Sequence, residues 1–179
     1  MFGCCNRFFS SSCRCNGCGC SGVTPPPTPT PMPIFPPVTP PTAPQLRGMQ
    51  VSLVGSSGGT VEQGACVAFD ALNSNNTLGV SYTPGSGKVN VARTGTYLVN
   101  WWVAIENAQT ATSLAFALSL NGSDVQTSYS DIGGGQIYGT AIVTVSSIPA
   151  TLTLVNRSGD AVTLVTAGGQ AGMTLTQFA

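Results

Sequence analysis

The chain has 179 residues, which is about the size of one folded domain with an appendage. Only six acidic and six basic side chains occur, 7% of the residues against a typical fraction of about a quarter, so Ser, Thr, Asn, Gln and Gly must cover most of the surface. The sequence has no basic stripe for nucleic acid, no apolar run of about 18 residues for a membrane and no secretory signal, so none of these three roles is expected.

Residues 1–23 form a cysteine-rich segment that we expect to act as an anchor. It contains six of the seven cysteines: Cys4, Cys5, Cys13, Cys15, Cys18 and Cys20. The small residues around them offer no core that could orient ligands or disulfides. A thiolate metal cluster, a self-contained disulfide knot and disulfides to other chains are the three alternatives. We favour intermolecular crosslinks by these six cysteines, with no metal and no cofactor.

Residues 24–48 are rich in proline and threonine, with eleven prolines between Thr24 and Pro44. Proline fixes φ and removes an amide donor, so neither helix nor sheet can form there. A polyproline II stalk is predicted, reaching about 65 Å at about 3.1 Å per residue. A disordered linker is the alternative, and the threonines between the prolines suit O-glycosylation.

Residues 49–179 show apolar side chains at every second position, which is the period of half-buried β-strands. Along TGTYLVNWWVAIE, one face carries Tyr97, Val99, Trp101, Val103 and Ile105, and the other carries Leu98, Trp102 and Ala104. This segment is predicted to be a central strand covered on both sides. Alternating runs near residues 114–120, 137–145, 152–154, 162–164 and 173–175 predict further strands. The predicted fold is an all-β jelly-roll sandwich of about ten antiparallel strands.

The same residues offer no catalytic machinery. The chain lacks histidine, which removes triads, Cys-His pairs and His-containing zinc sites. YTPGSGK departs from a phosphate-binding loop at Tyr82 and Val89, so a turn is predicted. The carboxylates lie mostly among turn residues, with a calcium site between two turns as the alternative. Cys66 is predicted to be a buried packing residue. An enzyme is not expected.

Three segments of this domain resemble a known family. TGTYLVNWWVAI is similar to its G-x-Y-x-V strand, SLAFALSLNGSDV resembles the next strand with its Asn-Gly turn, and AGMTLTQFA resembles the closing strand. The family is the tumour necrosis factor and complement-head jelly roll, especially the head of the collagen-like glycoproteins of the bacterial endospore surface (exosporium). The resemblance covers about residues 58–178.

The resemblance implies a homotrimer, in which the apolar face left out of the monomer core packs around a threefold axis. The residues expected to form the core and the trimer contact are Tyr97, Val99, Trp101, Trp102, Val103, Phe116, Leu175 and Phe178. A collagen stalk is excluded because glycine is missing at every third position, so the head must drive trimer formation itself.

The expected function is that of a structural protein of the spore surface. Its trimeric head stands on a proline-rich stalk, and its N-terminal cysteines are crosslinked to a protein of the spore layer. A ligand- or glycan-binding adhesin tip of the same fold is the main alternative. A metal-storing protein, in which the N-terminal thiolates are the function, is the third.

Overall fold

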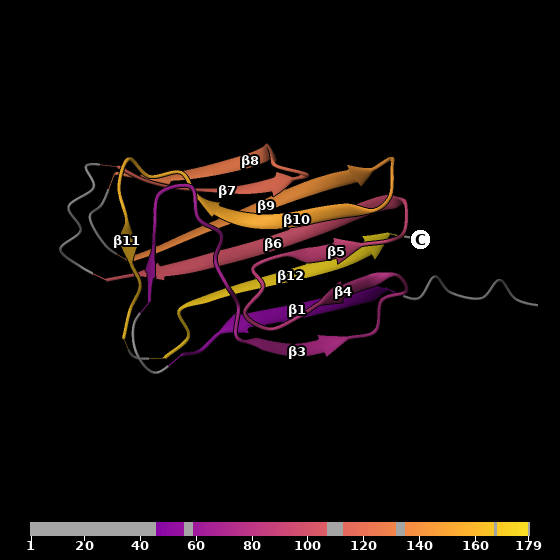
Figure 1. Ribbon diagram of the computed structural model, residues 1–179, viewed down its shortest axis with the longest axis horizontal. Helices are drawn as coiled ribbons and strands as arrows, with labels where there is room; N and C mark the ends of the chain where they lie inside the picture. Colours follow the sequence, from indigo (N-terminus) through magenta and orange to yellow (C-terminus); the bar gives the residue numbers. More distant parts are fainter. Residues whose placement is uncertain (1–45, 56–58, 107–112, 132–134, 167, 179) are drawn as a thin grey trace, which may run out of the picture. The chain divides into compact units, whose positions relative to one another are not determined.

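The computed structural model describes residues 46–55, 59–106, 113–131, 135–166 and 168–178. Within these ranges the secondary structure consists of strands and turns without a helix. Accordingly, no helix among them has the length and apolar character needed to cross a membrane. Most strands belong to two sheets that overlap in the view of Figure 1. The prediction of an all-β antiparallel sandwich is therefore confirmed.

The first sheet has five antiparallel strands. In spatial order they are β3 (Ala71–Asn75), β1 (Arg47–Leu53), β12 (Ala171–Phe178), β6 (Gly95–Ile105) and β9 (Gly135–Val145). The strand predicted to be central is β6, but β12 occupies the centre and β6 lies between β12 and the edge strand β9. β1 begins at Arg47, two residues before the predicted start of the domain at Met49.

The second sheet also has five antiparallel strands. In spatial order they are β4 (Val80–Tyr82), β5 (Val89–Val91), β10 (Ala150–Asn156), β7 (Leu114–Leu120) and β8 (Ser123–Ser130). A short ribbon of β2 (Thr60–Val61) and β11 (Val162–Thr163) completes the described strands. The edge strands β8 and β9 of the two sheets contact each other, so this side of the sandwich is partly closed.

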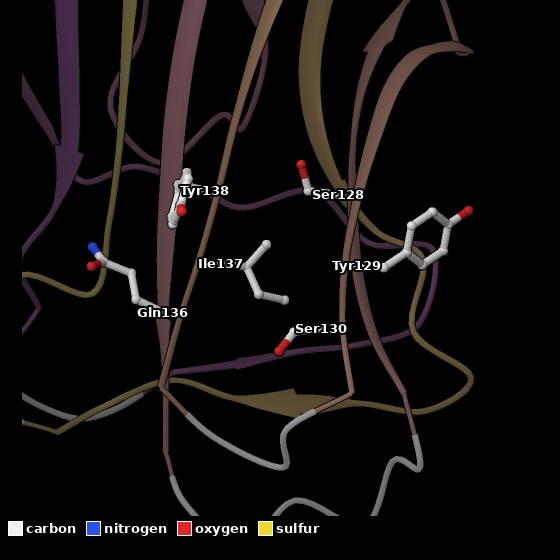
Figure 2. A pocket seen from close by; sticks show the side chains of 6 residues that line it. All are labelled: Ser128, Tyr129, Ser130, Gln136, Ile137 and Tyr138. Carbon is white, nitrogen blue, oxygen red and sulfur yellow. The ribbon is translucent and has the colours of Figure 1, made fainter.

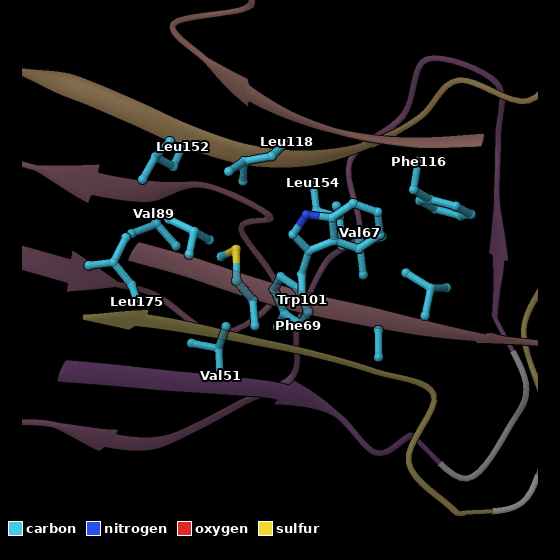
Figure 3. Packing of buried hydrophobic residues seen from close by; sticks show 14 of the residues in the cluster. Val51, Val67, Phe69, Val89, Trp101, Phe116, Leu118, Leu152, Leu154 and Leu175 are labelled. Atoms are coloured by element: carbon cyan, nitrogen blue, oxygen red, sulfur yellow. The ribbon is translucent and has the colours of Figure 1, made fainter. Parts of the chain in front are cut away.

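The core lies between the two sheets and is built from every second residue of their strands. Figure 3 shows the Trp101 indole in this layer, near Val67 and Leu154. Tyr97 is also buried, and its hydroxyl donates a hydrogen bond to the carbonyl oxygen of Arg93 at 2.7 Å. Each large apolar side chain removed from water in this way stabilises the fold by about 1.5–3 kcal/mol. The period of two in the sequence is therefore the direct cause of the layered core.

Two hairpin turns between strands depend on glycine or asparagine residues with positive φ. Asn121 and Gly122 both have positive φ, 51° and 85°, as a tight hairpin between β7 and β8 requires. The YTPGSGK stretch connects β4 to β5, and its Gly85 and Gly87 also have positive φ. There the Tyr82 hydroxyl donates to the Phe69 carbonyl oxygen and accepts from the Gly87 amide. This stretch is a hairpin loop, as predicted, and not a phosphate cradle.

Candidate functional site

The eight predicted packing residues separate into two groups. Six have side chains in the core between the sheets: Tyr97, Val99, Trp101, Val103, Phe116 and Leu175. Trp102 and Phe178 instead lie on the outward side of the first sheet, where Trp102 is half-buried and Phe178 is 44% exposed. The two faces predicted for β6 are therefore present, but its outward face is only partly covered.

The outward side of β6 and β9 gathers further apolar side chains. Trp102 is paired in register with Tyr138, and Leu98 with Ile142. Tyr138 is 76% exposed and Ile142 66% exposed. Phe178 lies on β12, where its pairing with Thr96 places it one step from Leu98 on the same side. We call Leu98, Trp102, Tyr138, Ile142 and Phe178 the outer patch.

Polar side chains cross the sheet between the two halves of the outer patch. Asn100 is paired with Thr140 on one side and with Thr174 on the other. The Thr140 hydroxyl donates a hydrogen bond of 2.8 Å to the Asn100 side-chain oxygen. This row carries no charge, so covering the outer patch would not desolvate an ionised group.

Two glycines hold the Trp102 ring flat against the sheet. A Cβ at Gly172, its partner on β12, would stand 2.6 Å from Nε1 of Trp102, and one at Gly169 would stand 2.9 Å from Cη2. Larger residues at these positions would push the ring outward. The glycines therefore give the outer patch a smooth surface beside Trp102.

A shallow cavity opens between the edge strands β8 and β9. It is lined by Ser128, Tyr129, Ser130, Gln136, Ile137 and Tyr138. Figure 2 shows Ile137 between the two strands, with Ser128 and Ser130 near it and Tyr129 directed away. Tyr138 belongs both to this cavity and to the outer patch, so the patch continues around the edge of the sheet.

An ion pair lies on the outward side of the second sheet. Arg157 Nε donates to one carboxylate oxygen of Asp124 at 2.8 Å, and Nη2 donates to the other at 2.9 Å. The Ser119 hydroxyl donates to the same carboxylate. The hydrogen bonds from Arg157 and then from Ser119 lower the pKa of Asp124 below its ordinary value. The hydrogen bond to Asp124 raises the pKa of Arg157.

Cys66 is the one cysteine that lies within the described residues. Cys66 is not a buried packing residue: it is half-buried and lines a groove beside Arg157, because its backbone bridges to Val155 at the edge of β10. The six N-terminal cysteines and the proline-rich residues 24–45 lie outside the described residues. Among those that are described, no group of three or more His, Cys, Asp or Glu side chains is placed to hold a metal ion.

Tyr138 and Ile142 were missed by sequence reasoning. Their segment alternates as predicted: Ile137, Ala141 and Val143 are buried, while Tyr138, Thr140 and Ile142 are exposed. That pattern indicates which side chains point outward. Two large apolar residues at outward positions could therefore have predicted an exposed apolar patch on this strand.

Comparisons with known proteins bear on the fold. No protein-family model matches the chain, and no curated protein sequence matches it. Among solved structures, murine APRIL is similar with a TM-score of 0.60 and 11% identity, over 75% of this chain and 100% of that one. Eiger TNF from S. frugiperda is similar with a TM-score of 0.60 and 15% identity, over 76% of this chain and 94% of the other.

A complement structure is similar as well. The globular domain of zebrafish complement 1qA protein has a TM-score of 0.51 and 13% identity, over 74% of this chain and 95% of the other. The head has the TNF and C1q jelly-roll fold. At these identities the likeness establishes the architecture of the head, while the role of the head has to be argued from its own surface.

Proposed function

We propose that the jelly-roll head associates with two further copies of itself through the outer patch. The observation that carries this proposal is the gathering of five apolar side chains on the outward side of three neighbouring strands, with Tyr138 and Ile142 mostly exposed. Exposed apolar side chains that gather on one face, here in two halves beside an uncharged polar row, are typical of a surface that contacts another protein. A partner surface would remove it from water, and the resemblance to TNF and complement heads supports a homotrimer.

A threefold ring also places a condition on the surface. Each copy must present two different contact regions, because the contacts in a closed ring of three are head-to-tail. The outer patch and the adjoining β8–β9 edge, with Tyr129 74% exposed, supply two such regions on one subunit. Their continuity through Tyr138 supports association around an axis near this edge.

We propose that the whole chain is a structural protein of a surface layer, namely that of the bacterial spore. The head would be displayed on the proline-rich stalk, and Cys4, Cys5, Cys13, Cys15, Cys18 and Cys20 would crosslink the chain to its layer. The low charge, the proline segment and the clustered cysteines support a fixed, displayed protein over a diffusing one.

The mass of the full chain in solution tests the association. In reductant, sedimentation is expected to give about three times the chain mass of 18.2 kDa. Ile142→Asp places a charge in the outer patch and is expected to give the single-chain mass. Leu78→Asp is the matched control, since Leu78 is 52% exposed outside the patch and its variant should stay trimeric. A wild-type chain that remains monomeric would refute the proposal.

The attachment is tested separately on spores. Nonreducing gels of spore-surface extracts are expected to show a ladder that collapses with reductant. A chain with the six N-terminal cysteines changed to serine should lose the ladder and be released by mild washing. Free monomer in both lanes, or antibody labelling confined to the cytoplasm, would contradict the anchoring role without affecting the trimer.

A further inference from the structure

A polar groove crosses the outward side of the second sheet, away from the outer patch. It encloses about 420 Å³, which is within the size range of small-molecule sites. Its walls come from the residue before β5, from β7, from β10 and the residue after it, from the β7–β8 turn and from the segment between β2 and β3. The lining residues are Gly64, Cys66, Lys88, Ser119, Asn121, Gly122, Thr151, Thr153, Val155 and Arg157.

Thr153 lies in the middle of this groove with an unused hydroxyl. Its register partner on β7 is Ser119. On the other side Leu152 is paired with Val89, so the same register, continued by one residue, places Thr153 opposite Lys88. Thr153 is 8% exposed as a whole residue, and no hydrogen bond of its hydroxyl is found among the residues that the structure describes. Its oxygen is not one of the fully buried unpaired atoms, so the hydroxyl is open to the groove. A hydroxyl that lines a groove and is not engaged within the protein can donate a hydrogen bond to a ligand or accept one from it.

Two cationic residues, Lys88 and Arg157, line the groove. The Lys88 ammonium group makes no ion pair with any described residue. Arg157 uses Nε and Nη2 for Asp124, and its other guanidinium N–H groups are left for a ligand. Because Asp124 balances only one of the two positive charges, the groove favours a ligand with one negative charge.

The remaining lining suits a hydroxylated ligand. The Asn121 side-chain oxygen accepts from the Thr151 amide, which fixes the side chain and leaves its NH₂ group to donate. Val155 and Cys66 add apolar side chains to the lining, and Gly64 and Gly122 contribute no side chains. The lining contains no aromatic ring, so the groove lacks a stacking platform for a nucleobase.

We propose that this groove binds a carboxylated sugar, with the carboxylate near Lys88 and Arg157 and the sugar hydroxyls on Thr153 and Asn121. This goes beyond the structural role proposed above and does not depend on it, because the groove and the outer patch belong to different sheets. The site gives the displayed head a recognition function for acidic saccharides.

The experiment uses the full chain in reductant and two probes that differ only in the carboxylate. Methyl β-D-glucuronide is added to isotope-labelled protein, and the amide signals of Asn121, Thr153 and Val155 are followed by NMR. Saturable shifts with a dissociation constant on the order of 1 mM are expected for a ligand of this size. Methyl β-D-glucoside, which lacks the charge, should bind at least about tenfold more weakly.

Variants assign the binding to the groove. Lys88→Met and the isosteric Thr153→Val should each weaken binding about tenfold, the usual cost of losing a hydrogen bond to a charged or buried group. Arg93→Met removes the same charge outside the groove and should leave binding within about twofold. Ile142→Asp should bind as the wild type does, which separates this site from the trimer.

Several outcomes would overturn the proposal. Equal binding of the glucoside would show that the carboxylate is not recognised, and equal loss in Arg93→Met would show general charge attraction. Inorganic phosphate that shifts the same amides with the same affinity would reduce the groove to an unspecific anion site. Absence of saturable shifts at these three amides would refute it outright.

Discussion

Trp101 on β6 packs its indole directly over Gly139, its register partner on β9. A Cβ at Gly139 would stand 2.4 Å from Cζ2 of the indole and 2.7 Å from the Ser128 hydroxyl oxygen of β8. No side chain fits between these groups. The largest buried side chain of the core therefore lies against a glycine, which has no side chain. This contact is located where the two sheets meet along the β8–β9 edge.

Replacing this glycine should strain the core. We expect Gly139→Ala to lower the free energy of unfolding by about 1–3 kcal/mol, the usual cost of overpacking. Urea unfolding at one fixed protein concentration measures this. Gly159→Ala is the control, because a Cβ there meets no atom within 4 Å and stability should hardly change. A Trp101→Leu change should recover part of the loss in Gly139→Ala; equal loss in both backgrounds would contradict the contact.

The buried side chain of Asn156 joins three backbone groups. Its amide nitrogen donates to the carbonyl oxygens of Val61 and Asp160, and its oxygen accepts from the Ser158 amide. Asn156→Ala would leave these groups unpaired, so we expect a loss of about 3 kcal/mol in the free energy of unfolding. Asn90→Ala, at an exposed strand position, should change it by less than about 0.5 kcal/mol. Similar values for the two variants would contradict this role.

The Asp124–Arg157 pair should make stability depend on pH. The folded-state pKa of Asp124 lies below its ordinary value of 3.8, so the ionised form is favoured in the folded state. The stability that the ion pair adds to the folded state is fully present above pH 3.8 and is lost as the pH falls through the lowered pKa of Asp124. Because both side chains are about one third exposed, it should stay below about 1 kcal/mol.

Thermal unfolding tests this dependence. At pH 7 the wild type should have a higher melting temperature than Asp124→Asn, and the difference should shrink as the pH is lowered below 3.8. Glu62→Gln provides the control, since the Glu62 carboxylate has no partner among the described residues. If the difference in melting temperature between the wild type and Asp124→Asn were the same at all pH values, the charge of Asp124 would play no part in stability.

Tryptophan fluorescence should report on the outer patch. Trp101 is 2% exposed in the single chain, whereas Trp102 is only half-buried. If the outer patch is covered in the trimer, Ile142→Asp should shift the emission to longer wavelength through Trp102 alone. Adding Trp102→Phe to both proteins should abolish the difference. An unchanged spectrum for Ile142→Asp would mean that Trp102 has the same surroundings with and without association.

Five long strands could be predicted from the sequence because their apolar residues recur with period two. β6, β7, β9, β10 and β12 all lie where alternation placed them. The edge strands β3 and β8 were missed, since ALNSN and SDVQTSYS are polar and mostly exposed and therefore carry no alternating signal. β3 and β8 bury little, so their composition is that of a loop, whereas the edge strand β9 buries every second side chain of its second half.

The outer patch could be predicted only in part. Alternation placed Trp102 opposite to Trp101, but the meeting of Trp102 with Tyr138 depends on the register between β6 and β9. These strands are far apart in the sequence, and neither one alone specifies its alignment with the other. The position of Cys66 likewise depends on a backbone bridge to β10 that no local pattern indicates.

The pairing of Arg47 with Gln177 has a practical consequence for engineering the head. Because β1 begins where β12 ends, a cargo fused after Phe178 would emerge beside the segment that leads into the head. Leu53, Ile105 and Gly135 lie at the other end of the strands of this sheet. A peptide inserted at that opposite end would lie at the far end of these strands from Arg47 and Gln177.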